Sequence, residues 1–107
     1  MANVKEIQEK MLENEHIEDI VILFKALSDE TRMKIVSALQ QDELCVSDIA
    51  EIVDMTSSSV SHQLKQLKFA GLIKARRDGK NIYYSLDDDH VGAILEIALA
   101  HVTHLHH

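Results

Sequence analysis

The chain is poor in the residues that build disulfide frameworks, flexible linkers and membrane spans. Its 107 residues include no proline, three glycines and one cysteine, Cys45. A single cysteine excludes an internal disulfide framework and fits a reducing compartment, so we expect a cytoplasmic protein without a signal peptide. No Pro-rich or Gly-rich linker and no repeat divides the chain, so residues 1–107 are expected to form one domain. The longest apolar runs are far too short for a membrane span, and we expect no membrane partner.

Positive charge is also scarce, but it is concentrated in one segment. The net charge is −7, and residues 1–54 carry five Lys or Arg against thirteen Asp or Glu. Residues 62–80 carry six basic residues against one acid, and residues 81–107 carry four acids with no Lys or Arg. A local basic excess of this kind suits contact with phosphates, so the charge pattern favours nucleic-acid binding through one surface only.

The spacing of apolar residues predicts five helices before residue 70. We expect them at about residues 3–14, 17–27, 28–39, 46–53 and 57–69. Ser28 is the expected N-cap of the third helix, and Thr56 or Ser57 that of the fifth. Gly71 is expected to end the fifth helix, as glycine often does.

A β-hairpin and a sixth helix are expected to complete the chain. Residues 72–76 and 82–86 are typical of strands, and the turn Arg77–Lys80 contains the Asp-Gly pair of a tight hairpin. Asp87 or Asp88 would cap a last helix whose apolar stripe is too strong to stay uncovered. The predicted fold is therefore mainly α with a β-hairpin (α+β), a winged helix-turn-helix that forms a homodimer through its terminal helices.

The fifth predicted helix begins with short hydroxyl side chains, which let a helix approach base edges and phosphates closely. A serine-rich start alone also occurs in helices that bind nothing. Together with an upstream helix, a glycine stop and a basic hairpin, it predicts binding to operator double-stranded DNA. The expected DNA-binding residues are Ser57, Ser58, Ser61, His62, Gln63, Lys65, Lys68, Arg76, Arg77 and Lys80.

The last predicted helix carries Asp88, His90, His101 and His104. His90 and His101 point to nearly the same side of the helix but lie about 16 Å apart along it. One metal ion with ligand bonds of about 2 Å cannot reach both ends. A second, antiparallel copy would bring His101 and His104 of one chain to Asp88 and His90 of the other, and two-fold symmetry would create this site twice. Three imidazoles and one carboxylate suit tetrahedral Zn²⁺ or Co²⁺.

Several motifs, in the same order, resemble the ArsR/SmtB family of bacterial metal-sensing repressors. They are Ala26–Arg32, Glu43–Ala50, Val60–Leu64 and Tyr83–Leu86, and the resemblance runs from about residue 20 to 105. It implies a dimeric winged-helix repressor that binds operator DNA without metal and releases it when metal binds. It also implies that Ser58, Ser61 and His62 face the DNA. The set Asp88, His90, His101 and His104 resembles the dimer-interface zinc site of the family at all four positions.

Other metal sites of the family match less well. The arsenic or antimony site needs a cysteine pair near Arg32, where the chain has none, and the cadmium or lead site has a second cysteine where Ser47 stands. Cys45 and Asp48 match positions that bind zinc with the N-terminal arm in some zinc sensors, and His16 is the histidine available there. A small buried apolar residue is the simpler interpretation of Cys45.

Alternatives remain for the metal and for the class of protein. His106 and His107 at the end of the chain would add ligands in a nickel or cobalt sensor, so zinc stands first and nickel or cobalt second. An enzyme is not expected, because four protein ligands leave no open position on the metal and no other catalytic set occurs. A zinc-stapled interaction module that binds no DNA is a further alternative, against which the basic segment 62–80 argues.

Overall fold

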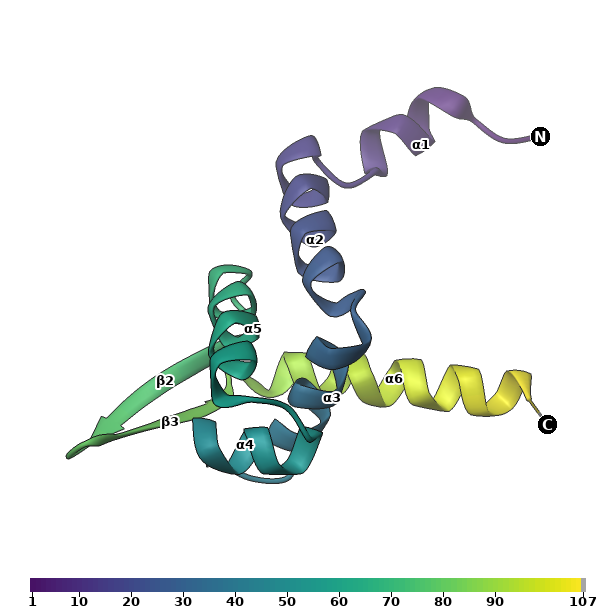
Figure 1. Cartoon of the computed structure of the whole chain (residues 1–107). Helices are drawn as coiled ribbons and strands as arrows, with labels where there is room; N and C mark the ends of the chain where they lie inside the picture. Colours follow the sequence, from purple (N-terminus) through teal and green to yellow (C-terminus); the bar gives the residue numbers. More distant parts are fainter. Residues whose placement is uncertain (107) are drawn as a thin grey trace.

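The computed structural model describes residues 1–106 and consists of six helices and three short strands (Figure 1). Helices form both ends of the chain, and the strands come between them in the sequence. The helices are α1 (Val4–Lys10), α2 (Asn14–Leu27), α3 (Glu30–Leu39), α4 (Val46–Val53), α5 (Ser57–Phe69) and α6 (Asp89–Leu105). The strands are β1 (Leu44–Cys45), β2 (Ile73–Asp78) and β3 (Asn81–Leu86). The predicted mainly α fold with a β-hairpin is confirmed, and α4 and α5 form the helix-turn-helix.

The sheet is antiparallel with strand order β1-β3-β2. In the hairpin, Ile73 pairs with Leu86 and Asp78 with Asn81, so the turn consists of Gly79 and Lys80 alone. The predicted turn at 77–80 was therefore two residues too long, because β2 continues through Asp78. Strand β1 was not predicted, since two residues are too few to show an alternating pattern.

Local capping interactions set the ends of the helices that carry the DNA-binding motif. The Thr56 side chain accepts a hydrogen bond from the Ser59 backbone nitrogen at 3.1 Å and so caps α5. At the other end Gly71 has φ 77°, and Leu72 N–H bonds back to the Leu67 carbonyl at 3.0 Å, which closes a Schellman motif. Thr56 and Gly71 therefore fix the length of α5 as the sequence predicted.

The predicted cap of α3 was wrong by one residue. Asp29, and not Ser28, has extended backbone angles and accepts a hydrogen bond from the Arg32 backbone nitrogen at 3.0 Å. Ser28 instead ends α2, where its hydroxyl donates to the Phe24 carbonyl at 2.8 Å. The predicted first helix at 3–14 is also shorter and is interrupted after Lys10, because Met11 has extended backbone angles.

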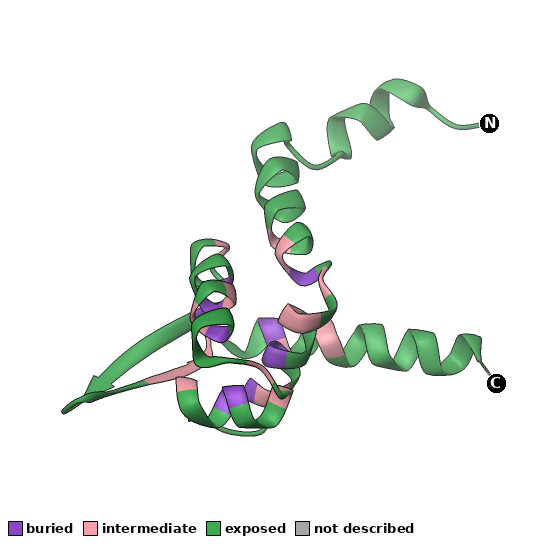
Figure 2. Ribbon diagram, in the orientation of Figure 1, coloured by how far each residue is buried: buried purple, intermediate pink, exposed green. Residues whose placement is uncertain are grey.

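The hydrophobic core lies where α3, α4 and α5 meet the sheet. Figure 2 shows the buried residues gathered there, while the helices at the two ends are exposed along most of their length. The buried apolar residues are Leu27, Ile35, Val36, Leu39, Ile49, Ala50, Val60, Leu64, Leu67, Leu72, Ile73 and Val91. These residues fix how α5 and the hairpin sit beside one another.

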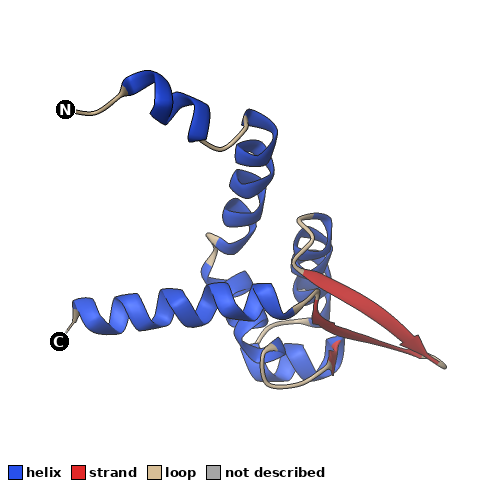
Figure 3. Ribbon diagram, turned by 180° about the vertical axis from the view of Figure 1, so that it is seen from behind, coloured by secondary structure: helices blue, strands red, loops and turns tan. Residues whose placement is uncertain are grey.

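Two arms extend from this core: the N-terminal arm, residues 4–24, and the C-terminal arm, residues 96–105. Seen from behind in Figure 3, they project to the same side, away from the hairpin. The radius of gyration is 17.0 Å, against about 13 Å for a compact domain of this length. No helix within the described part of the chain is long and apolar enough to cross a membrane.

Candidate functional site

Helix α5 presents the predicted DNA-contacting residues on its outer face. Val60, Leu64 and Leu67 are buried in the core and thereby fix the rotation of the helix. Opposite them, the exposed or half-buried positions bring together Ser57, Ser58, Ser61, His62, Lys65 and Lys68. Short hydroxyls near the helix start and cations further along form a face that suits close approach to DNA.

Gln63 does not belong to this face. It is half-buried, and its Oε1 accepts a hydrogen bond at 3.0 Å from Arg32 Nη1 on α3. One step along a helix rotates a side chain by about 100°, which turns Gln63 toward α3 while His62 points outward. We therefore leave Gln63 out of the candidate DNA surface.

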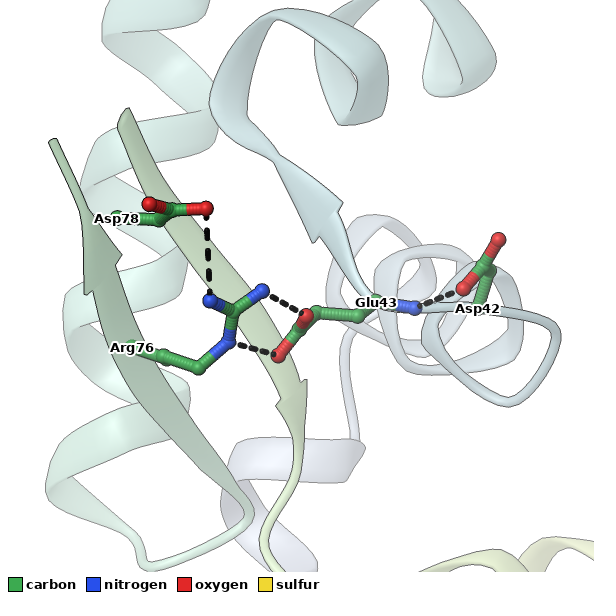
Figure 4. A network of polar contacts seen from close by, with 4 residues as sticks. All are labelled: Asp42, Glu43, Arg76 and Asp78. Carbon is green, nitrogen blue, oxygen red and sulfur yellow. Dashed lines mark hydrogen bonds and ion pairs between the residues drawn. The ribbon is translucent and has the colours of Figure 1, made fainter. Parts of the chain in front are cut away.

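The wing, formed by β2 and β3, is tied to the segment before β1 by an ion pair (Figure 4). Arg76 binds the Glu43 carboxylate with two parallel contacts, Nη2 to Oε1 at 2.6 Å and Nε to Oε2 at 3.2 Å. Asp78 Oδ2 lies 3.8 Å from Arg76 Nη1, and the guanidinium carbon lies 5.1 Å from the centre of the Tyr83 ring. The predicted DNA-binding residue Arg76 is thus already engaged by Glu43 and Asp78, and it braces the middle of the wing, where it pairs with Tyr83.

The ion pair shifts the titration of both partners. The hydrogen bond from Arg76 lowers the pKa of Glu43 below its ordinary value, although partial burial of the carboxyl acts in the opposite direction. The hydrogen bond to Glu43 raises the pKa of Arg76. Both groups are therefore charged at neutral pH, and the bidentate geometry gives the contact a defined direction.

The remaining cations of the wing are exposed. Lys74 and Arg77 lie on β2, and Lys80 occupies the turn. Within the described residues, the ion pairs of the wing involve Arg76 and not these three side chains. Lys74, Arg77 and Lys80 are therefore available for phosphate contacts beside α5.

Cys45 lies at the junction of β1 and α4 and is half-buried. Its Sγ donates to Asp48 Oδ2 at 3.2 Å and lies 3.2 Å from Ser47 Oγ. Cys45 and Asp48 are thus adjacent, as a zinc site with His16 would need. Within residues 1–106 of one chain, however, no three His, Cys, Asp or Glu side chains form a group that could hold a metal ion.

Asp88 and His90 converge at the start of α6. Asp88 is the N-cap, and its Oδ1 accepts a hydrogen bond from the His90 backbone nitrogen at 2.9 Å. Its second oxygen, Oδ2, lies 3.4 Å from His90 Nδ1. Two donors on one tetrahedral ion with bonds near 2 Å lie about 3.3 Å apart, so this pair fits two positions around one zinc ion. We call Asp88 and His90 the N-terminal half-site.

The charge state of Asp88 also suits a metal ligand. Partial burial raises the pKa of its carboxyl, but hydrogen bonds from the His90 ring and from the backbone of His90 and Val91 outweigh this effect. The net result is a pKa below the ordinary value for aspartate. The carboxyl is therefore ionised at neutral pH.

His101 and His104 lie at the other end of α6 and are exposed. Three residues apart on a helix, they are neighbours on one face. We call them the C-terminal half-site. His106 follows at the C-cap, and the predicted additional ligand His107 lies outside the described residues.

Helix α6 is anchored to the core only at its beginning. Val91 is buried, and Nε2 of Gln40, the C-cap residue of α3, donates to the Gly92 carbonyl at 3.4 Å. Further along, the helix borders an open apolar groove of about 500 Å³ together with α2 and α3. The groove is lined mainly by Phe24, Leu27, Met33, Ile94, Leu95, Ala98, Leu99 and Val102.

Residues 29–75 match the family model described as "Bacterial regulatory protein, arsR family". The chain is 48% identical over 84 residues to a cadmium resistance transcriptional regulatory protein CadC homolog of Staphylococcus aureus, covering 78% of this chain and 69% of that protein. The chain belongs to the ArsR family. It is also 40% identical over 91 residues to the transcriptional repressor SmtB homolog of Synechocystis sp., covering 85% of this chain and 69% of the homolog.

A solved structure supports the same placement among ArsR-family proteins. The homodimeric winged helix-turn-helix DNA-binding domain of a possible ArsR-family regulator from Mycobacterium bovis superposes with a TM-score of 0.77 at 29% identity. The match covers 92% of this chain and 96% of that domain. This ArsR-family chain is thus a winged helix-turn-helix transcriptional regulator and not an enzyme.

Three residues of the site were missed by reasoning from the sequence. Arg32 on α3 binds Gln66 on α5 and so holds that helix, and Glu43 holds the wing. Arg32 and Glu43 lie within motifs that carry the family resemblance, which was a usable signal. Their partners are 31 to 34 residues away in the chain, so no spacing rule identifies the contacts.

Proposed function

We propose that this protein is a metal-responsive repressor that binds operator double-stranded DNA as a homodimer without metal and releases it when Zn(II) binds. The observation that carries the proposal is the division of one donor set between the two ends of α6. The N-terminal half-site already has donor atoms 3.4 Å apart, and the C-terminal half-site is exposed on the same face of the helix. Each half supplies two ligands, so two copies of the chain complete a tetrahedral set.

The surface of the two arms supports dimerisation. Exposed apolar side chains run along α1, α2 and the second half of α6, including Ile20, Phe24, Ile97 and Leu99. Exposed apolar side chains gathered along neighbouring helices are typical of a protein–protein interface. The similar domain from Mycobacterium bovis is homodimeric. The whole chain, residues 1–107, would then act as one DNA-binding domain with arms that pair.

The position of Ile97 supports an antiparallel pairing of the two α6 helices. Ile97 is seven residues after His90 and four before His101, so it shares their face of the helix. It also lies near the midpoint between the two half-sites, and 71% of it is exposed. In the proposed dimer the two copies of Ile97 meet close to the two-fold axis, while the half-sites meet on either side.

The outer face of α5 and the wing support DNA as the partner. We assign contacts near base edges to Ser57, Ser58, Ser61 and His62, and phosphate contacts to Lys65, Lys68, Arg77 and Lys80. The rest of the chain is acidic, so phosphate contact is confined to this surface. Binding of this kind falls steeply with rising salt concentration.

Bound zinc would cross-link the two helices of the dimer at both ends. The residues Asp88 and His90 hold the beginning of one α6, and His101 and His104 hold the end of the other. Helix α6 follows the wing directly, Val91 is buried in the core, and Gly92 is bound by Gln40 at the end of α3. Fixing α6 would therefore fix the spacing of the two α5 helices. A coupling of about 2 to 3 kcal/mol would weaken DNA binding roughly 30- to 150-fold.

A cobalt(II) titration read by visible absorption, with and without DNA from the protein's own upstream region, tests the proposal. We expect intense tetrahedral bands without a sulfur charge-transfer band, one metal per chain, and release of the DNA. Weak octahedral bands would overturn zinc in favour of a nickel or cobalt sensor that uses His106 and His107 as additional ligands. A thiolate band would place Cys45 in the site.

Matched variants separate the metal site from the DNA site. His101→Ala should keep its DNA affinity in the absence of metal and lose metal-driven release, whereas His16→Ala should behave as wild type. If metal still released the His101→Ala protein, the α6 assignment would be wrong. Failure of the wild-type protein to shift the DNA would instead favour a metal-stapled interaction module.

A further inference from the structure

Arg32 connects three parts of the molecule through one side chain. Its Nε donates to the Ala26 carbonyl at 2.6 Å, and Nη2 lies 3.4 Å from the Lys25 carbonyl, both at the end of α2. Its Nη1 donates to Gln63 Oε1 at 3.0 Å and to Gln66 Oε1 at 2.9 Å on α5. The guanidinium of Arg32 on α3 therefore holds the last turn of α2 and helix α5 together.

These contacts determine which way the Gln66 amide faces. A guanidinium offers only donors, so the atom of Gln66 that faces Arg32 must be the carbonyl oxygen. The amide nitrogen, Nε2, then points to His62, whose Nε2 lies 3.0 Å away. An amide nitrogen also offers only donors.

The orientation of Gln66 in turn selects one form of the His62 ring. Because Gln66 donates, His62 Nε2 must be the unprotonated acceptor, and the ring hydrogen is on Nδ1. A hydrogen on Nε2 would face the amide hydrogens. Turning the amide over to accept it would place an NH₂ group against Arg32.

We propose that Arg32 and Gln66 are positioning residues that present His62 to DNA as a hydrogen-bond donor through Nδ1. The inference rests on the proposed function only in placing His62 against DNA. An Nδ1–H group matches acceptors such as phosphate oxygens or guanine N7 and O6, and it does not match the amino groups of adenine or cytosine. The same guanidinium holds the last turn of α2, from which the N-terminal arm extends, so the arm and His62 share one anchor.

Long-range ¹H–¹⁵N NMR of the histidine rings in the free protein tests this relay, the chain of hydrogen bonds from Arg32 through Gln66 to His62, without DNA or metal. The His62 signals are identified by their loss in His62→Ala, and spectra are recorded in mildly alkaline buffer, where histidines are neutral. We expect the Nδ1–H pattern for His62 in the wild type. An Nε2–H pattern in the wild type would overturn the proposal.

Substitutions at residue 66 sharpen the test. Gln66→Glu places an acceptor against both Arg32 and His62, so His62 should change to the Nε2–H pattern, and Gln66→Ala should give a mixture of both forms. Gln63→Ala is the matched control, because Gln63 contacts Arg32 in the same way but makes no contact with His62. A change of the His62 form in Gln63→Ala alone would overturn the relay.

Fluorescence anisotropy with a labelled duplex from the upstream region tests the consequence for DNA. Gln66→Ala should weaken binding about two- to fivefold, because only the fraction of His62 left in the Nδ1–H form can donate to DNA. The salt dependence should be unchanged, because no Lys or Arg contact to phosphate is lost. Unchanged affinity despite a changed His62 form would overturn the role of the relay in recognition. Failure of the wild type to bind the duplex would overturn the proposed function and leave the NMR result standing.

Discussion

Residues 27–91 and the two arms use apolar side chains in opposite ways. Among the described residues 1–106, every buried apolar residue lies between Leu27 and Val91, and seven of them have less than 2% of their surface exposed. The arms have the same helical spacing of apolar residues, yet Phe24, Ile97 and Leu99 are each at least half exposed. The periodicity thus identifies an apolar helix face that must be buried, and only the fold shows whether residues of the same chain bury it.

The largest effect is expected from Ile35, a residue of the central region with no exposed surface. Ile35→Ala should lower the free energy of unfolding by about 2 to 5 kcal/mol, because it removes buried methyl groups and leaves a cavity. Ile52→Ala, at a residue of α4 that is 57% exposed, is the matched control and should cost less than about 0.5 kcal/mol. Urea denaturation compares the two, and equal losses would contradict the assignment of the core.

A substitution in the arms should change the assembly of the dimer and not the folding of the chain. In the proposed dimer, Ile97→Glu places two carboxylates near the two-fold axis, so the dissociation constant should rise at least about 100-fold, or about 2.7 kcal/mol. Sedimentation equilibrium measures this change, and circular dichroism should show unchanged helix content. Ile52→Glu should remain dimeric. A dimeric Ile97→Glu protein would rule out the antiparallel pairing of α6.

A smaller effect is expected where the N-terminal arm joins the core. Asp29→Ala removes the N-cap of α3 and should cost about 1 kcal/mol of unfolding free energy. Ser28→Ala, which removes an exposed bond at the end of α2, should cost clearly less. Urea denaturation of the two variants decides between the structural cap and the one expected from the sequence.

The smallest effect belongs to the exposed ion pair between Glu43 and Arg76. Because the pKa of Glu43 is lowered in the folded protein, the pair stabilises at neutral pH, and this contribution is lost as pH falls below the ordinary glutamate range and through the lowered pKa. The raised pKa of Arg76 gives a contribution that is lost only in strong alkali. Thermal denaturation between pH 6 and about pH 3 should show a slightly steeper loss for the wild type than for Glu43→Gln. Parallel curves would show that the brace of the wing is without effect on stability.

Much of this fold is determined by local sequence patterns. Helix α4 and the end of α5 were predicted at their observed bounds, since Gly71 and the apolar spacing act within a few residues. The cap of α3 was misplaced because Ser28 and Asp29 are both good capping residues, and only the backbone angles separate them.

The candidate site was predictable where its chemistry lies along one helix, and not where it depends on contacts between elements. The spacing of His90 and His101 is a property of α6 alone. The removal of Gln63 from the DNA face and the engagement of Arg76 by Glu43 arise from packing of α3 on α5 and of the wing on the segment before β1. No sequence periodicity records such partners.

The separation of the two half-sites on α6 has a genetic consequence. If each site takes half of its ligands from each chain, two kinds of chain form inactive pure dimers. One lacks His101 and His104, and the other lacks Asp88 and His90. A mixed dimer of the two, however, regains one intact site at one end of the helix pair. Two defective alleles of this gene, expressed in the same cell, should therefore complement each other in the response to metal.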